Sequence, residues 1–545
     1  MTGPVDFGWV LPATAGTGLD HLAVQAPSTR MYSELVPGIT NVTDRAAYLT
    51  FYPWLFWAWE QRRSSVPLSL EQLVRRGEVL FTLIGERHAR KTDAPDELHG
   101  ATMIGRQKLV PALRGFADHD EIPVARFAAP RAGGDPLSYF QNRFGGLGQY
   151  YLGPMRELGI LATSNGRHGY TPERGEPLAR ALAARAPADA FFAALEQGTT
   201  TPAALDAMAG LCPCGLAANR EEVELLLDLL LDRAGTQGAE ANARRDSIAL
   251  MLDLLSRARP GMEGLTGERW CRGAAYAQSI APGQPWTLGQ RLERRREARA
   301  AYVRHELFSV ALQTMFWAAL HVVATDGAGA VPDIDTIATL VARRAGDGLG
   351  SRATVLLDAA LRNRAASLPP LSDWHLDDHE SQRADHAIKA ARDEDVPAAV
   401  AAAVDILLAL VVRGIPDEPY VAFRFEAGYF TDYPIHLTSF RALVENHRHD
   451  WTALDLARHL TTEWGVHAHF RVALRKLHGE GLDTFRIRPL DDALVWVASP
   501  EPTWTTPRLQ NIEQFLCDLG LAQWQPEGPA TLTDVGRATW ETLRG

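Results

Sequence analysis

The C-terminal part of the chain carries the cationic residues best spaced for binding a polyanion. Arg471, Arg475 and His478 recur at intervals of four and three residues, so on a helix they share one face. Such a helix fits the major groove of a DNA duplex, and its cations release counterions from the phosphates. Arg486 and Arg488 lie two residues apart, which places them on one side of a strand. We therefore predict a nucleic-acid interface made of Arg458, Arg471, Arg475, Lys476, His478, Arg486 and Arg488.

This interface must be local, because the chain as a whole is acidic. It has 66 aspartates and glutamates against 55 lysines and arginines, a formal net charge of -11, so a general attraction of the surface to nucleic acid is excluded. The segment from Leu456 to Arg488 is cationic by contrast. Its arginines would also suit the acidic side chains of a protein partner, or pack within the protein itself. The sequence leaves these alternatives open.

A second group of residues has the types that bind metal ions. His375 and His379 are four residues apart and could share one ion on a helix. Asp378 and His386 lie close enough in sequence to complete its coordination. The segment is polar, as a loop would be, and it matches no hydrolase signature. We keep these four residues as candidate metal ligands and predict no bound cofactor.

Two other runs contain potential metal ligands. Residues 445–450 include two histidines and two acids. Cys212-Pro213-Cys214 places two thiols one residue apart, which is not the spacing of a zinc knuckle, and no second pair of cysteines lies nearby. Neither run by itself predicts a metal site.

Sequence motifs of several enzyme classes are missing. None of the four lysines follows a glycine, which excludes the phosphate-binding loop of P-loop ATPases. The chain also has no H-E-x-x-H motif and no G-x-S-x-G motif. We predict no catalytic residues and expect a protein without enzymatic activity. A metal-dependent nuclease or hydrolase that uses His375 and His379 is the alternative.

The hydrophobic pattern predicts a mainly α-helical, multidomain protein with two or three winged-helix units. In the first unit a helix closes at Gly159, a hairpin turns at Asn165-Gly166, and Pro172 enters a second helix. The end of the chain repeats this order with Leu519-Gly520-Leu521, a hairpin, and a helix that begins after Thr533. Both segments resemble the end of bacterial winged-helix modules.

The third unit precedes this last segment and is more complete. Helices over Ala453–Thr462 and Val466–His478 are separated by a short turn at Glu463–Gly465, and strands over Asp483–Arg488 and Ala493–Ala498 form a wing. A linker rich in proline and glycine covers Ala128–Pro136. The predicted domains are a helical domain (1–130), a winged-helix-like unit (131–190), a central helical domain (191–445), a winged helix (446–500) and a winged-helix-like unit (501–545).

Two helices are predicted near the N-terminus. Thr43 can cap an aromatic helix that contains Phe51, Pro53 and Trp54, and this helix would be either part of the core or a surface for a partner or for stacked bases. Ser69 begins a capping-box pattern that opens a second helix.

The composition also bears on the compartment. Four cysteines in 545 residues make no disulfide framework, and the N-terminal residues lack the basic start and apolar core of a signal peptide. The apolar stretches Leu307–Ala324 and Val396–Val412 contain polar residues such as Gln313 and Asp405, which favours buried helices over membrane spans. We expect a cytoplasmic protein that does not contact a membrane.

The segment Leu35–Thr43, followed by the aromatic helix, resembles the opening of large bacterial proteins from phage-defence gene clusters. The layout of winged-helix units around a helical centre is also similar to kleisin-like subunits, whose winged helices bind the heads of SMC-type ATPases. The kleisin-like resemblance implies a protein partner, such as an ATPase subunit, and the cationic segment from Leu456 to Arg488 predicts DNA as the other partner. We expect a non-enzymatic DNA-binding or scaffolding subunit of a bacterial defence or DNA-maintenance complex, with a kleisin-like adaptor as the alternative.

Overall fold

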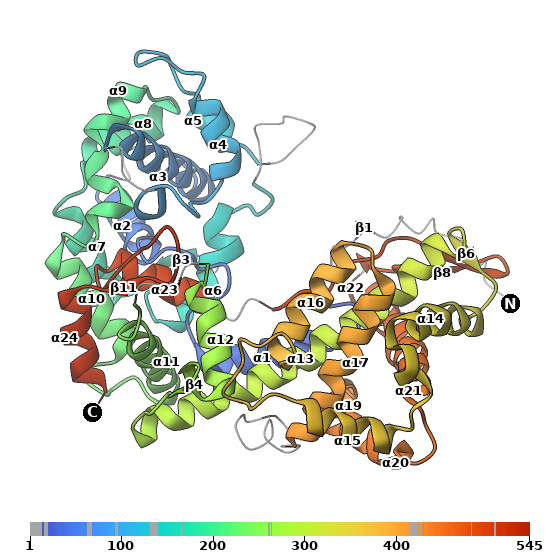
Figure 1. Cartoon of the computed structure of the whole chain (residues 1–545). Helices are drawn as coiled ribbons and strands as arrows, with labels where there is room; N and C mark the ends of the chain where they lie inside the picture. Colours follow the sequence, from blue (N-terminus) through green and yellow to red (C-terminus); the bar gives the residue numbers. More distant parts are fainter. Residues whose placement is uncertain are drawn as a thin grey trace, which may run out of the picture. The chain divides into compact units, whose positions relative to one another are not determined.

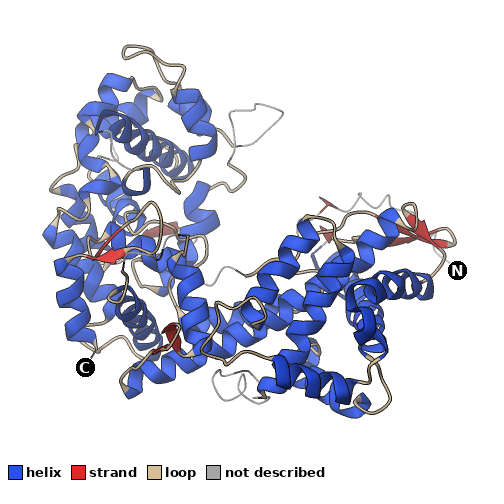
Figure 2. Cartoon of the chain, viewed as in Figure 1, coloured by secondary structure: helices blue, strands red, loops and turns tan. Residues whose placement is uncertain are grey.

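The computed structural model is mainly helical, as the hydrophobic pattern predicts (Figures 1 and 2). It describes residues 14–15, 20–62, 68–92, 96–130, 140–164, 167–259, 262, 264–414, 423, 425, 428–480, 482–505 and 508–544. The chain divides into two compact units. Unit 1 comprises residues 1–32, 272–287 and 296–505, and unit 2 comprises residues 33–271, 288–295 and 506–545.

The aromatic helix of unit 2 is a core helix. This helix, α2 (Tyr48–Glu60), contains Pro53 and buries Phe51 and Trp54 completely. The ring of Phe51 stacks on that of Phe81 of α3 (Leu70–Thr92), with 4.2 Å between the ring centroids. This burial supports the core interpretation over a surface for stacked bases. The predicted cap is wrong, because α2 begins at Tyr48 without a side-chain cap and the Thr43 hydroxyl instead lies 2.6 Å from that of Thr40.

The start of α3 follows the capping-box prediction. The amide of Ser69 donates a hydrogen bond to the Gln72 side chain, and the amide of Gln72 donates one to the Ser69 hydroxyl. The other helices of unit 2 outside the segments described next are η1 (Asp96–Leu98), α4 (Arg106–Leu113), α5 (Val124–Phe127), α8 (Ala188–Gln197), α9 (Pro202–Ala207), η3 (Ala209–Leu211), η4 (Pro213–Gly215), α10 (Arg220–Leu231) and α11 (Ala239–Leu255).

Two segments of unit 2 repeat one order of elements, a helix, a two-stranded hairpin and a second helix. The first consists of η2 (Leu147–Tyr151), α6 (Leu152–Glu157), β2 (Leu161–Ser164), β3 (Arg167–Tyr170) and α7 (Gly175–Ala183). The second consists of α23 (Leu509–Asp518), β10 (Ala522–Gln523), β11 (Thr531–Leu532) and α24 (Asp534–Leu543). The predicted hairpin turn at 165–166 and most of the predicted linker lie outside the described residues.

The two segments also share their hydrogen bonds. Gly159 and Gly520, which follow the first helices, have left-handed φ angles of 72° and 70°. The hydroxyl of Thr171 donates to the carbonyl of Gly159, and that of Thr533 donates to the carbonyl of Gly520, each over 2.7 Å. Both hydroxyls then accept from the amide of a glycine three or four residues later. The two segments are therefore an internal structural repeat.

The glycine at the start of each second helix is required by close packing. A β-carbon at Gly536 would lie 1.8 Å from the carbonyl oxygen of Leu521, which belongs to the backbone and cannot rotate away. We expect Gly536→Ala to lower the free energy of unfolding by about 1–3 kcal/mol, as overpacking does. Gly153→Ala in α6 is the matched control, since a β-carbon there meets nothing within 4 Å. Guanidinium denaturation measures both variants, and equal stability of Gly536→Ala and wild type would contradict the repeat's packing.

Unit 1 is built around two long apolar helices. These are α13 (Gln290–Thr325), most of which belongs to unit 1, and α17 (Val396–Arg413). Both are long and apolar enough to cross a membrane. In the most apolar 18 residues of each helix, however, 83% of α13 and 67% of α17 is buried inside the protein. Burial in the core therefore accounts for their composition, as predicted. Besides the elements described in the next two paragraphs, unit 1 contains α14 (Ile334–Leu349), η5 (Gly350–Thr354), α15 (Leu357–Ser367), α16 (Glu380–Arg392), α19 (Tyr429–Asp432), α20 (Leu437–His447), β4 (Ser279–Ala281) and β5 (Gln284–Pro285). Two helices, α1 (Gln25–Leu35) and α12 (Gly267–Ala277), contribute residues to both units.

The segment predicted as the C-terminal winged helix contains a continuous helix and a hairpin. The helix runs through α21 (Ala453–Thr461), the π-helical η6 (Thr462–His467) and α22 (Ala468–Glu480) without a break. The predicted turn at Glu463–Gly465 is therefore wrong. Gly465 is buried, and a β-carbon there would be in ordinary van der Waals contact with Phe316 of α13, so the helix passes through the protein interior at the position predicted as a turn.

A hairpin follows where the wing is predicted, and its strands are shorter than expected. Strands β8 (Ile487–Leu490) and β9 (Ala493–Trp496) pair antiparallel, and β6 (Ala330–Val331) adds to β9 in a sheet of order β6-β9-β8. A separate parallel pair joins β7 (Leu482–Asp483) to β1 (Thr14–Ala15). The hairpin and the C-terminal end of α22 thus adjoin in sequence, as the predicted interface requires.

Candidate functional site

Four of the seven predicted nucleic-acid-binding residues are exposed on the continuous helix. Arg471, Arg475 and His478 lie on α22, and Arg458 lies on α21. The guanidinium of Arg475 lies over the ring of Tyr433, 5.5 Å from its centroid. The spacing of the three α22 residues and their exposure together give this helix one cationic face.

The other three predicted cations make contacts within unit 1. The Nζ of Lys476 donates to the carbonyl of Asp20 over 2.7 Å, and Nε of Arg486 lies 3.4 Å from the ring of His21. Arg488 forms a 2.6 Å ion pair with Asp483. These contacts tie Lys476 and Arg486 to the segment that contains Asp20 and His21, whereas Arg488 stays exposed on the hairpin beside Asp483.

Exposed apolar side chains accompany this cationic face. Leu474 lies three residues after Arg471 and is 46% exposed, and three apolar residues of the hairpin segment, Leu490, Trp496 and Val497, are between 38% and 54% exposed. A contiguous apolar patch marks a surface that binds a partner, whereas single exposed apolar residues are common on any protein. The same segment therefore offers both charge and apolar area.

The predicted histidine pair does not lie on one helix. Helix α16 begins at Glu380, His375 lies in the exposed turn before it, and the buried His379 caps the helix by accepting from the amide of Ser381. Burial lowers the pKa of His379 to about 4, although the Glu380 carboxylate opposes this shift. Asp378 is ion-paired with Arg383. The four-residue spacing thus joins a turn residue to a helix cap, and His375 and His379 do not share a helical face.

His386 lies on α16, and Asp378 contributes instead to a small cavity of unit 1. This cavity has a volume of about 190 Å³ and an apolar side that includes Leu408. Its polar lining includes Arg364, which donates to the carbonyl of Asp378 over 2.7 Å, and Asp405, which is paired with Arg352. Arg364 is thus bonded to a backbone carbonyl and Asp405 to an arginine.

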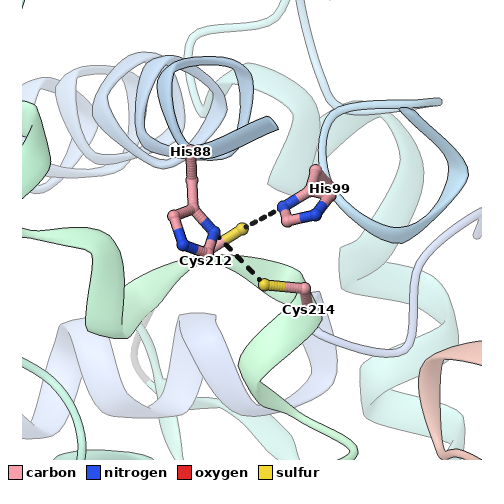
Figure 3. A group of neighbouring side chains, drawn as sticks. All are labelled: His88, His99, Cys212 and Cys214. Atoms are coloured by element: carbon pink, nitrogen blue, oxygen red, sulfur yellow. Dashed lines mark hydrogen bonds between the residues drawn. The ribbon is translucent and has the colours of Figure 1, made fainter. Parts of the chain in front are cut away.

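The structure gathers a different group of metal-ligand types in unit 2. His88, His99, Cys212 and Cys214 each point one ligand atom toward a common centre, and these four atoms all lie within 4.8 Å of one another (Figure 3). The Nδ1 atom of His99 is 3.2 Å from Sγ of Cys212, and Nδ1 of His88 is 3.3 Å from Sγ of Cys214. Among the residues that the structure describes, it is the group that could hold a metal ion.

Three pieces of backbone bring these residues together. His88 lies near the end of α3, His99 follows η1, and the two cysteines flank Pro213 at the start of η4. Gly85 of α3 permits their close approach, since a β-carbon there would lie 3.2 Å from the carbonyl oxygen of His99. The group is therefore formed by long-range packing.

Two arginines fix the backbone around the group. Arg45, which is buried, donates hydrogen bonds to the carbonyls of Leu98, His99 and Ala101. Arg185 donates to the carbonyls of Gly210 and Cys212 and is ion-paired with the buried Glu222. Side chains of this kind orient a site before any ligand arrives.

The electrostatic surroundings favour a thiolate at one of the cysteines. A hydrogen bond from Cys212, followed by the imidazoles of His99 and His88, lowers the pKa of the Cys214 thiol. Cys212 is completely buried and His99 is 3% exposed. The pKa of the Cys212 thiol is raised by the neighbouring Cys214 and by burial. Cys212 and His99 are thus closed to water, and His88 and Cys214 are half-buried.

The sequence shows the two cysteines of this group as neighbours, but it does not show that the two histidines lie beside them. The Cys-x-Cys pair is visible there, but His99 lies 113 residues from Cys212 and His88 lies 126 residues from Cys214. The packing of α3, the segment after η1 and the η3–η4 segment makes them neighbours. No protein-family model, curated protein or solved structure matches the chain, so its function is argued from the geometry of these sites.

Proposed function

We propose that the protein is a non-enzymatic DNA-binding subunit of a bacterial defence or DNA-maintenance complex and that it contacts the duplex through α22. The observation that carries this proposal is the shared exposed face of Arg471, Arg475 and His478. A helix with such a face enters the major groove and positions itself by phosphate contacts. The order of α22 and the β8–β9 hairpin, with β6 as third strand, supports a winged-helix interpretation of this segment.

The proposal predicts binding that depends on salt. We expect the triple variant Arg458→Gln/Arg471→Gln/Arg475→Gln to bind a labelled DNA duplex far more weakly than wild type does. The plot of the logarithm of the binding constant against the logarithm of the salt concentration should also become less steep, by about 0.9 for each phosphate that the variant no longer neutralises. Fluorescence anisotropy of the full chain over a series of salt concentrations measures both quantities. A matched triple variant of exposed arginines on other helices of unit 1, Arg343, Arg362 and Arg392, should bind as wild type does. Unchanged binding by the α21–α22 variant would contradict the proposal.

A protein-binding adaptor, as in kleisin-like subunits, is the second candidate. The exposed Leu474 and Trp496 favour it, because apolar area contributes little to phosphate binding and much to protein interfaces. Absence of duplex binding by the wild-type chain, together with nuclease-resistant co-purification of an ATPase subunit, would favour this adaptor over the DNA-binding subunit.

A further inference from the structure

We propose that unit 2 holds a zinc ion between His88, His99, Cys212 and Cys214, in a closed tetrahedral site of structural type. This site lies outside the cationic face and does not depend on the function proposed for it. The proposal stands on the convergence of the four side chains, on the chemistry of their ligand atoms, and on the fixed backbone around them (Figure 3).

The distances suit a zinc ion. Zinc binds sulfur at about 2.3 Å and nitrogen at about 2.0–2.1 Å, which in a tetrahedron places neighbouring ligand atoms roughly 3.3–3.8 Å apart. The two nitrogen–sulfur pairs of the group are 3.2 Å and 3.3 Å apart, and all separations are within 4.8 Å. Rotations of the side chains are therefore enough to complete the geometry.

The ligand types select the metal. Two thiolates and two neutral imidazoles are the Cys₂His₂ set of structural zinc sites, and hard cations such as Mg²⁺ and Ca²⁺ prefer oxygen ligands. Both cysteines are free thiols, so both sulfurs are available. Because four protein side chains fill a tetrahedral zinc, the site keeps no open position for a substrate.

The surrounding residues fix the positions of the backbone segments that carry the four ligands. Gly85 allows the carbonyl of His99 to approach α3, Arg45 holds the segment that carries His99, and Arg185 holds the carbonyl of Cys212. A zinc ion bound here would crosslink the end of α3, the segment after η1 and the η3–η4 segment. We infer that it stabilises these three pieces of unit 2 against local unfolding.

The first experiment measures metal content. The full-length chain, produced with zinc in the medium and dialysed against metal-free buffer, should contain about one zinc per chain by mass spectrometry. Cys214→Ser and His88→Ala should each lower this content at least about tenfold. Cys271→Ser and His119→Ala, which remove the same atom types elsewhere in unit 2, should retain it. If the ligand variants contain as much zinc as wild type does, any bound zinc lies elsewhere and the proposal is overturned.

A second measurement uses only the wild-type chain and therefore does not depend on whether a variant folds. Co²⁺ added to the metal-depleted full chain should give the visible d–d absorption of a tetrahedral complex and a thiolate-to-cobalt charge-transfer band, and added Zn²⁺ should remove both. A wild-type chain that contains no zinc and gives no thiolate–cobalt band would overturn the proposal as well.

Discussion

Replacing Asp518 by Asn should lower the free energy of unfolding by about 3–5 kcal/mol, the usual cost of breaking a buried ion pair on one side. Asp518 and Arg45 have side chains that are 1% and 0% exposed, and their closest charged atoms are 2.9 Å apart. Asp518 also accepts from the amide of Ala46. An asparagine keeps the shape but leaves the Arg45 guanidinium buried without its counter-charge.

Three further variants separate the ion pair from its surroundings. Arg45→Met should be destabilising to a similar extent. The double variant Arg45→Met/Asp518→Leu should recover only part of the stability, because it leaves no buried charge unpaired but removes the partners of the carbonyls of Leu98, His99 and Ala101. Arg233→Ala removes an exposed partner of Asp228 in the same unit and should change the free energy of unfolding by about 1 kcal/mol or less. Urea denaturation provides all four values. A decrease for Asp518→Asn no larger than that for Arg233→Ala would contradict the burial of this pair.

The sequence predicted best the features that depend on neighbours along the chain. The capping box at Ser69, the buried helices α13 and α17, and both helix–hairpin–helix segments follow from local patterns of apolar, turn and capping residues. Leu-Gly-Ile and Leu-Gly-Leu indicate a left-handed residue after a helix because glycine adopts that conformation without strain.

Features that depend on distant parts of the chain escaped prediction. Lys476 and Arg486 contact Asp20 and His21, more than 450 residues away in sequence, and no local pattern indicates these contacts. The helix continues through Gly465, which is buried and lies near Phe316, about 150 residues away in sequence. His379 has the spacing of a metal ligand but serves as a helix cap, and the metal-ligand group forms from residues whose pattern has no recognisable spacing.

The buried carboxyl of Glu78 gives the second large expected effect, a decrease in stability as the pH rises. Burial raises the pKa of Glu78 from 4.5 to about 7, against the amides of Gly146 and Leu147 and the hydroxyl of Tyr52, which donate to it and lower the pKa. The folded protein therefore holds this proton where the unfolded chain has released it. The stabilisation from Glu78 is complete below pH 4.5 and is lost as the pH rises toward 7, by on the order of 3 kcal/mol.

Glu78→Gln isolates this contribution, since glutamine does not titrate. The difference in free energy of unfolding between wild type and Glu78→Gln should fall by on the order of 3 kcal/mol between pH 4.5 and about 7. Tyr52→Phe should shift the fall to higher pH, because it removes a hydrogen bond that favours the ionised carboxylate. Denaturant unfolding at a series of pH values checks both expectations. A difference that stays constant over this range would mean that Glu78 has the same pKa in the folded protein and in the unfolded chain. That result would contradict the raised pKa of this buried carboxyl.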